Sequence, residues 1–337
     1  MIETCISLDN RDAWRSALYG VPHAYGHTWE SCQAMARTTG YRTFLYVFED
    51  GVDRAVCTFA ERPFGVYTDV VTPYGFSGFV SRGHCCDAAR RWREFATGRG
   101  YVCGYIGLNP FLYDPTLCEP DELFEYNCVY GIDLRMELEE LVARMAKVRR
   151  RQVRNAERMN CYVFDRKRLT EFLLEHYRTF YRDRGASAVY DFKPETLVAI
   201  AECADSYLVG TESDGTVNAV MLFAYTRYIG EYFLNVSVAE GQRNSVALLW
   251  QGMKELKSRG VAWLNLGGGI RPGDGVAEFK ERFGGTVLPL RSLKQVYNRA
   301  RYEALCVGAS VDPADRAGYF PPYRRPVRVD ERVAVSS

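Results

Sequence analysis

The stretch "LVGTESDGTVNAVMLFA", residues 208–224, consists of two apolar runs joined by an Asp-Gly turn, and "YVFEDGVDRAVCTFA", residues 46–60, repeats that pattern. Each stretch reads as a strand, a tight turn and a second strand, which is typical of a β-hairpin. The chain therefore carries the same local structure twice, once in each half.

The segments after each hairpin are also repeated. After the first come a strand over 65–72, the helix "CDAARRWREFATGRG" and the strand "YVCGYIGL"; after the second come "GEYFLNVSV", the helix "SVALLWQGMKELKSRG" and the strand "VAWLNL". Both helices end in Arg-Gly, and glycine is the residue that most often stops a helix. The sequence thus predicts an α+β unit of roughly 150 residues that is present twice.

This repeat sets the predicted domain boundaries. We expect an N-terminal domain over 1–143, a connecting helix over 144–160, a C-terminal domain over 161–305, and an extended Pro- and Arg-rich tail over 306–337.

Composition excludes few functions. The 337 residues are 47% hydrophobic and hold 43 basic against 42 acidic side chains, so any attraction for a polyanion must come from a local patch. The 11 cysteines are scattered, and we expect reduced thiols in a cytoplasmic protein. No leader segment or membrane span is recognisable. The four histidines show no zinc-site spacing, so no metal is expected.

The predicted connecting helix is the local patch. Between Arg144 and Arg158 it holds seven basic residues and the single acid Glu157. A charge run is usually a solvated face, but cations this close repel one another unless an anion is near, which suits an RNA backbone. The candidate tRNA-binding residues are Lys147, Arg149, Arg150, Arg151 and Arg154.

The order of elements resembles the GNAT acyltransferase fold, and two such units in tandem resemble the Fem family of aminoacyl-tRNA-dependent transferases. The most specific matches are "RRRQVRNAERMNCYV", like the arginine-rich helix of that family, and "LNLGGGIRPGDGVAEFKERFGG", like its glycine turn and Phe-Lys helix. The coiled-coil arm of some members is missing. The resemblance implies transfer of an amino acid from tRNA to an amine of a peptidoglycan precursor or a peptide natural product, with no other cofactor.

Lys280 and Phe279 are the candidate catalytic residues. On a helical wheel Val276, Phe279 and Phe283 share one face with Lys280 at its edge, so the pattern alone favours a lysine whose stem covers the core. The resemblance instead implies that Lys280 stabilises the oxyanion formed when an amine attacks an ester, with Phe279 holding it in place.

The remaining candidates would bind substrates. Gly267, Gly268 and Gly269 either make a tight strand exit or bring backbone N–H groups close to a ligand, with Asp274 starting the next helix. The resemblance implies an acceptor site in the turn "VVTPYGFSG" and on the helix "FLLEHYRTFYRDRG". The candidate residues are Tyr74 and Gly75 in that turn and Tyr181 and Arg182 on that helix. Trp29 in the first half and Asn235 in the second are further substrate-binding candidates.

Two other functions stay open. An acyl-CoA transferase of the same fold needs a glycine-rich turn for the pyrophosphate, whereas "VSVAEGQRNSVALLW" has only Gly241 and the first unit only Gly83 at that place. A non-catalytic RNA-binding protein is the other alternative. The sequence does not indicate the amino acid, the acceptor, a general base or the oligomeric state.

Overall fold

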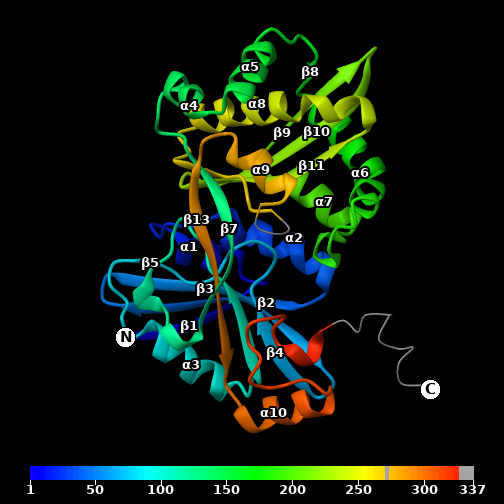
Figure 1. Cartoon of the computed structure of the whole chain (residues 1–337). Coiled ribbons are helices and arrows are strands. Elements are labelled where there is room, and N and C mark those ends of the chain that lie inside the picture. Colours follow the sequence, from blue (N-terminus) through cyan, green and yellow to red (C-terminus); the bar gives the residue numbers. More distant parts are fainter. Residues whose placement is uncertain (270–272, 326–337) are drawn as a thin grey trace, which may run out of the picture.

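One mixed sheet runs through both halves of the chain (Figure 1). In residues 1–269 and 273–325, which the computed structural model describes, thirteen strands pair in the order β1-β2-β3-β4-β6-β13-β7-β12-β11-β10-β9-β8, with β5 beside β3. The strands are β1 (Ile2–Ser7), β2 (Arg42–Asp50), β3 (Asp53–Phe64), β4 (Tyr67–Val71), β5 (Val80–Arg82), β6 (Cys103–Gly107), β7 (Leu123–Asp133), β8 (Tyr162–Val163), β9 (Ser206–Ser213), β10 (Thr216–Tyr225), β11 (Ile229–Ser237), β12 (Trp263–Asn265) and β13 (Thr286–Val296).

Helices cover both faces of this sheet. They are α1 (Arg11–Leu18), α2 (Trp29–Thr39), α3 (Ala88–Gly98), α4 (Leu138–Arg144), α5 (Lys147–Ala156), α6 (Arg166–Asp183), α7 (Pro194–Ala201), α8 (Ser245–Ser258), α9 (Gly275–Glu281) and α10 (Arg299–Gly308). Short 3₁₀ turns join them at η1 (Tyr25–His27), η2 (Pro115–Leu117), η3 (Pro120–Glu122), η4 (Ala188–Tyr190), η5 (Ala239–Asn244) and η6 (Pro322–Arg324).

The repeat predicted from the hairpins is present. β2 pairs with β3 and β9 pairs with β10, and Gly51 and Gly215 lie in the turns with positive φ. Each hairpin leads through a third strand and a helix to a parallel strand, giving the parallel pairs β4–β6 and β11–β12. Gly100 and Gly260 follow the two helices in the left-handed conformation, as the Arg-Gly signal predicts.

Strand pairing crosses the predicted domain boundaries. β13 belongs by sequence to the second half, but Ser292–Val296 pairs with β6 of the first half, while β7 of the first half pairs with β12 of the second. In Figure 1, β13 and β7 lie side by side along the middle of the molecule. Each half thus contributes a strand to the sheet of the other half. The sequence pattern within either half does not reveal this pairing.

The connecting helix is shorter than predicted. α4 ends at Arg144, residues 145 and 146 are extended, and α5 begins at Lys147 and ends at Ala156. Met145 is buried in the core beneath α8, and anchoring it there bends the chain between two short helices.

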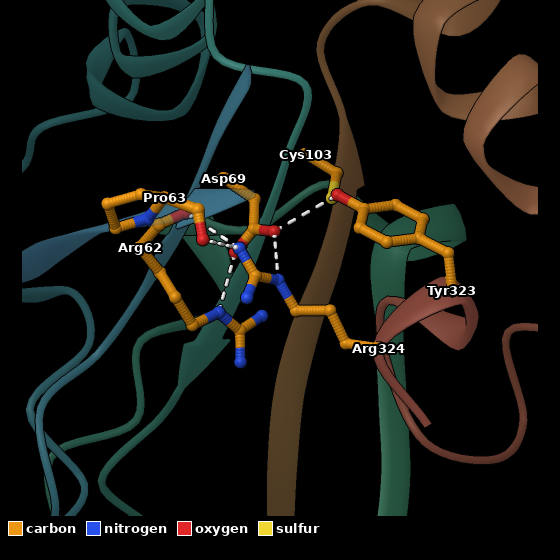
Figure 2. A network of polar contacts seen from close by, with 6 residues as sticks. All are labelled: Arg62, Pro63, Asp69, Cys103, Tyr323 and Arg324. Carbon is orange, nitrogen blue, oxygen red and sulfur yellow. Dashed lines mark hydrogen bonds and ion pairs between the residues drawn. The ribbon is translucent and has the colours of Figure 1, made fainter. Parts of the chain in front are cut away.

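The tail also differs from the prediction where the structure describes it. Instead of lying extended from residue 306, the chain completes α10 and then buries Phe320 and Tyr323 against β6. Asp69 fixes this segment (Figure 2): the Tyr323 hydroxyl donates to it at 3.0 Å, Arg324 Nε at 2.6 Å and Arg62 Nε at 2.7 Å. Residues 326–337 of the predicted tail lie outside the described residues.

Two apolar cores lie on the two faces of the sheet in the second half. On one face of the sheet, α8 and α5 bury Phe223, Trp250 and Met253. On the other face, α6 and α7 pack on a core that also contains Tyr25 and Met35 of the first half. The two halves therefore share apolar packing as well as strands.

Candidate active site

The glycine turn after β12 is held close to β7. Gly267 adopts φ +70°, and its N–H donates to Asn265 Oδ1 at 2.8 Å. A Cβ at Gly268 would meet the carbonyl oxygen of Cys128 at 2.3 Å, so only glycine fits there. Asn127 Nδ2 donates to the Gly269 carbonyl at 3.0 Å. The tight strand exit is thus present, and these contacts fix its backbone.

Lys280 lies on the buried face of α9 and points into this turn. Its Nζ donates to the Gly268 carbonyl oxygen at 2.6 Å and lies 5.7 Å from the centre of the Tyr232 ring. The residue is 6% exposed, and no carboxylate of the described chain forms an ion pair with it. Burial lowers the pKa of Lys280 to about 8, with Asp274 opposing the shift.

The helical-wheel prediction for α9 needs one correction. The inward face consists of Ala277 and Lys280, whereas Val276 is 45% exposed. Asp274 begins the helix as predicted, because its Oδ1 accepts from the N–H groups of Val276 at 3.0 Å and Ala277 at 2.8 Å. Lys280 therefore lies at the middle of the buried face rather than at its edge.

Phe279 joins α9 to the basic helix α5. The Arg149 guanidinium lies 4.3 Å from the centre of the Phe279 ring and donates to the Phe279 carbonyl at 3.2 Å. Phe283 packs edge-on against the same ring at 5.5 Å. These contacts hold Phe279 in place one residue before Lys280.

An open pocket of about 370 Å³ borders Phe279. It is formed by α5, the C-terminal end of α6, α9, the end of β11, η5 and the start of α8. Three arginines line it: one on α5, one directly after α6 and one on η5. The lining residues are Arg149, Gln152, Phe180, Arg184, Asn235, Ser237, Gln242, Arg243, Ser245, Val246 and Phe279. Of these, Arg149, Asn235 and Phe279 were predicted site residues, and Arg184 and Arg243 were missed.

Arg149 is a buried cation of this pocket. It is 6% exposed, its Nη1 donates to Gln152 Oε1 at 2.7 Å, and its Nε has no hydrogen-bond partner among the described residues. It forms no ion pair within the part of the chain that the structure describes. Burial lowers the pKa of Arg149, Arg282 lowers it further, and Glu278 opposes them. A buried guanidinium without a carboxylate is suited to an anionic ligand.

The other predicted tRNA-binding residues do not line the pocket. Lys147, Arg151 and Arg154 are exposed on α5, while Arg150 is half-buried and donates to the Ala143 carbonyl at 3.2 Å. The basic helix therefore has an outward cationic face and one arginine that reaches into the pocket.

Tyr74 connects the first half to this region. Its ring packs edge-on against Tyr190 at 5.7 Å, Phe192 at 5.0 Å and Phe233 at 5.5 Å. Tyr190 in turn stacks on Tyr181 at 5.3 Å. The following Gly75 has φ +108°, a turn conformation that L-residues with side chains rarely adopt. The predicted residues Tyr74, Gly75 and Tyr181 thus lie in one aromatic region between the two halves.

Two predicted acceptor residues lie elsewhere. The Arg182 side chain is 70% exposed and pairs with Asp183 at 3.3 Å, because this position of α6 faces outward. Trp29 packs in the first half's own core, where its Nε1 donates to the Leu8 carbonyl at 2.7 Å. Neither side chain meets the aromatic region around Tyr74.

Glu231 on β11 was missed. It is 9% exposed, and its Oε1 is buried without a hydrogen-bond partner in the described structure. Burial raises the pKa of Glu231 to about 7. The pKa of Tyr74 is raised by burial, then by Tyr190, Tyr181 and Glu231. The Glu231 carboxyl therefore interacts electrostatically with the aromatic region around Tyr74. The available signal was a lone acid inside the apolar strand "GEYFLNVSV".

Other kinds of site find no support among residues 1–269 and 273–325. No group of three or more His, Cys, Asp or Glu side chains is arranged to hold a metal ion there. All eleven cysteines are free. Within the same residues, no helix combines the length and apolar character that a membrane crossing requires.

Solved structures share this architecture at low sequence identity. FemX has a TM-score of 0.67 and 13% identity, over 90% of this chain and 99% of that one. The C-terminal domain of a putative lysylphosphatidylglycerol synthetase from Agrobacterium fabrum has a TM-score of 0.53 and 14% identity, over 89% of this chain and 96% of that one. L-PGS from Bacillus licheniformis has a TM-score of 0.51 and 12% identity, over 86% of this chain and 93% of that one. No protein-family model matches the sequence, and no curated protein is significantly similar to it. The α+β fold of two GNAT-like units, with the architecture of FemX, is confirmed.

Proposed function

We propose that this chain is an acyltransferase that moves an amino acid from aminoacyl-tRNA to an amine of a peptide-like acceptor. The observation that carries the proposal is Lys280, a buried cation with no ion pair among the described residues, whose ammonium is fixed on the glycine turn. A desolvated ammonium in a fixed position stabilises negative charge far better than one in water.

The transfer reaction requires few other catalytic groups from the protein. The aminoacyl ester is already activated, and the acceptor amine is the nucleophile. Attack of the amine on the ester carbonyl gives a tetrahedral oxyanion, which Lys280 stabilises. Collapse of this intermediate forms the amide and releases the ribose hydroxyl. Two contacts hold Lys280 in position. Its ammonium is fixed on the Gly268 carbonyl, and the packing of Phe279 against Phe283 holds α9, the helix that carries Lys280.

The pocket beside Phe279 is the proposed site for the end of the carrier. Arg149, Arg184 and Arg243 supply positive charge there, which suits the phosphodiester groups next to the aminoacylated end of tRNA. Arg149 belongs to the same helix as the exposed Lys147, Arg151 and Arg154. This arrangement favours a long polyanion that enters the pocket with one end and continues over α5.

An acyl-CoA carrier is the alternative, because the same pocket lies at the start of α8, where backbone N–H groups attract phosphate. The glycine of that turn argues against it. Gly241 donates its N–H to the Val238 carbonyl at 3.1 Å, and a Cβ there would meet the Asn218 carbonyl at 2.1 Å. Gly241 is therefore required for packing and has no free N–H for a pyrophosphate.

The experiment is mass spectrometry of a small-molecule extract incubated with the protein, total tRNA, synthetases and isotope-labelled amino acids, with and without RNase. A labelled amide that disappears with RNase supports the proposal and identifies the acceptor, cell-wall precursor or peptide natural product, by mass. An acyl product formed only with added CoA thioesters supports the alternative. Binding of tRNA without any product supports the non-catalytic RNA-binding function.

A further inference from the structure

The last turn of α9, which carries Lys280, is held by hydrogen bonds from α5. The final carbonyl groups of a helix have no partner within the helix and need a donor from elsewhere. Arg149 Nη2 donates to the Phe279 carbonyl at 3.2 Å. The Ala146 N–H, directly before α5, donates to the Arg282 carbonyl at 3.0 Å. The start of α5 therefore fixes the end of the helix that presents Lys280.

The Arg149 guanidinium is itself held rigidly between the two helices. It lies 4.3 Å from the centre of the Phe279 ring and 5.2 Å from that of Phe283, just after α9. Its Nη1 donates to Gln152 Oε1, on its own helix, at 2.7 Å. It borders the pocket, and within the described residues it forms no ion pair. One buried cation thus both contacts α9 and brings an uncompensated charge to the pocket.

The contact of Arg149 with α9 affects Lys280 through its position. Lys280 Nζ lies 2.6 Å from the Gly268 carbonyl oxygen and 5.7 Å from the centre of the Tyr232 ring. Burial lowers the pKa of Lys280, Asp274 opposes this shift, and Arg149 is not among the causes. The titratable groups that face Lys280 among the described residues are therefore Asp274 and Tyr232. A movement of α9 would change how deeply the ammonium is buried.

We infer that Arg149 is a positioning residue for Lys280, which fixes the last turn of α9 and so sets the distance between the pocket and the ammonium. This role rests on the proposed function, in which the pocket holds a phosphodiester of the carrier and Lys280 meets the ester oxyanion. Because one guanidinium borders the phosphate site and holds the helix of the lysine, a carrier bound there presents its ester carbonyl at a fixed place. Misplacement by about 1 Å costs on the order of 10²-fold in rate.

Arg149→Lys separates binding of the carrier from positioning of Lys280. Lysine keeps the charge but lacks the planar fork that donates to the Phe279 carbonyl and stacks on its ring. We expect kcat to fall by about 10- to 100-fold with little change in Kd for tRNA. Wild-type transfer should fall as pH rises through about 8, the pKa of Lys280. In Arg149→Lys this decline should move to higher pH, because a loosened α9 buries the ammonium less and its pKa returns toward 10.5.

A second measurement needs no substrate. NMR titration of protein labelled with ¹³C at the lysine ε-carbon gives the pKa of Lys280, whose signal is identified by its absence in Lys280→Arg. We expect a pKa of about 8 in wild type and a clearly higher value in Arg149→Lys. Arg149→Gln buries no unpaired charge and should raise the same pKa, so it replaces Arg149→Lys if that variant does not fold.

Arg166→Lys is the matched control, because Arg166 also donates to carbonyls at the end of a helix, those of Ala201 in α7 and Cys203 just after it. It should leave kcat, its pH dependence and the pKa of Lys280 as in wild type. A loss in Arg149→Lys that lies wholly in Kd for tRNA, or an unchanged pKa of Lys280, would overturn the positioning role. Wild type that transfers nothing from charged tRNA, with the expected pKa difference between wild type and Arg149→Lys, would overturn the proposed function and support the control of Lys280 by Arg149.

Discussion

Lys280 is the side chain on which the proposed reaction depends. Because its ammonium is desolvated and fixed on Gly268, Lys280→Ala should lower kcat by about 10²- to 10³-fold and leave tRNA binding unchanged. Transfer from labelled aminoacyl-tRNA and a filter-binding assay measure the two quantities.

Lys257 provides the matched control. It is half-buried and also donates to backbone carbonyls, but these belong to Leu134 and Met136 and not to the glycine turn. Lys257→Ala should keep wild-type turnover. Equal losses in both variants would show that lysine removal disturbs the fold rather than the chemistry.

The charge of Lys280 also predicts a pH dependence. Its pKa is lowered to about 8 by burial, and only the protonated form stabilises an oxyanion. The transfer rate should therefore fall as pH rises through about 8. Lys280→Arg keeps its charge at any pH in this range, so whatever activity it retains should not fall there. A decline of equal shape in Lys280→Arg would assign the ionisation to another group.

At the scale of elements, the glycine turn is required because of its distance from β7. Gly268→Ala would bring a methyl group to 2.3 Å from the Cys128 carbonyl, so the turn must move and the acceptor of Lys280 with it. We expect a loss of about 1–3 kcal/mol in the free energy of unfolding and a loss of about tenfold or more in kcat.

Gly275→Ala is the control for that variant. Nothing among the described residues lies within 4 Å of a Cβ at Gly275, which is the first residue of α9. This substitution should therefore leave turnover and thermal unfolding close to wild type. An active Gly268→Ala would remove the turn from the proposed mechanism.

The helix α5 carries a separate prediction. Arg151 and Arg154 are exposed, so reversing both to Glu should weaken tRNA binding and reduce its salt dependence. The slope of log Kd against log salt should fall by about one for each phosphate that the protein no longer neutralises. Arg299→Glu with Arg301→Glu on α10, at the opposite end of the molecule in Figure 1, is the control. If the α5 and α10 double variants weakened tRNA binding equally, the binding would reflect general electrostatic attraction and not a site on α5.

At the scale of the whole molecule, Asp69 fastens the C-terminal segment to the first half. Its carboxylate is fully buried and accepts from Arg62, Tyr323 and Arg324. Asp69→Asn removes the charge and leaves two largely covered guanidinium groups, those of Arg62 and Arg324, without a counterion. The free energy of unfolding should fall by about 3–5 kcal/mol in chemical denaturation.

Asp133→Asn is the matched control, because Arg135 in that ion pair is 63% exposed and the pair lies at the surface. It should cost about 1 kcal/mol or less. A similarly small cost for Asp69→Asn would mean that the apolar contacts of Phe320 and Tyr323 hold the segment without the ion pairs.

Much of the fold could be predicted from the sequence, because its signals are local. Alternating apolar residues and Asp-Gly turns specify the hairpins, Gly100 and Gly260 stop the helices, and Asp274 begins α9. Each depends on neighbours within a few positions. The site was predictable only in part. Arg184 and Arg243 carry no such signal, the lone acid Glu231 in an apolar strand was overlooked, and the residue types of Arg182 and Trp29 did not reveal which way their side chains face.

The sequence by itself determined the two α+β units, their order and the helix that presents Lys280, because backbone conformation follows from local patterns of side chains. Only the tertiary structure decided that β13 and β7 join the halves, that Arg149 turns into a pocket, and that Glu231 is buried without a partner among the described residues. Those features depend on which distant segments of the chain pack together. Burial shifts the pKa values of Glu231 and Lys280 only after those segments have packed.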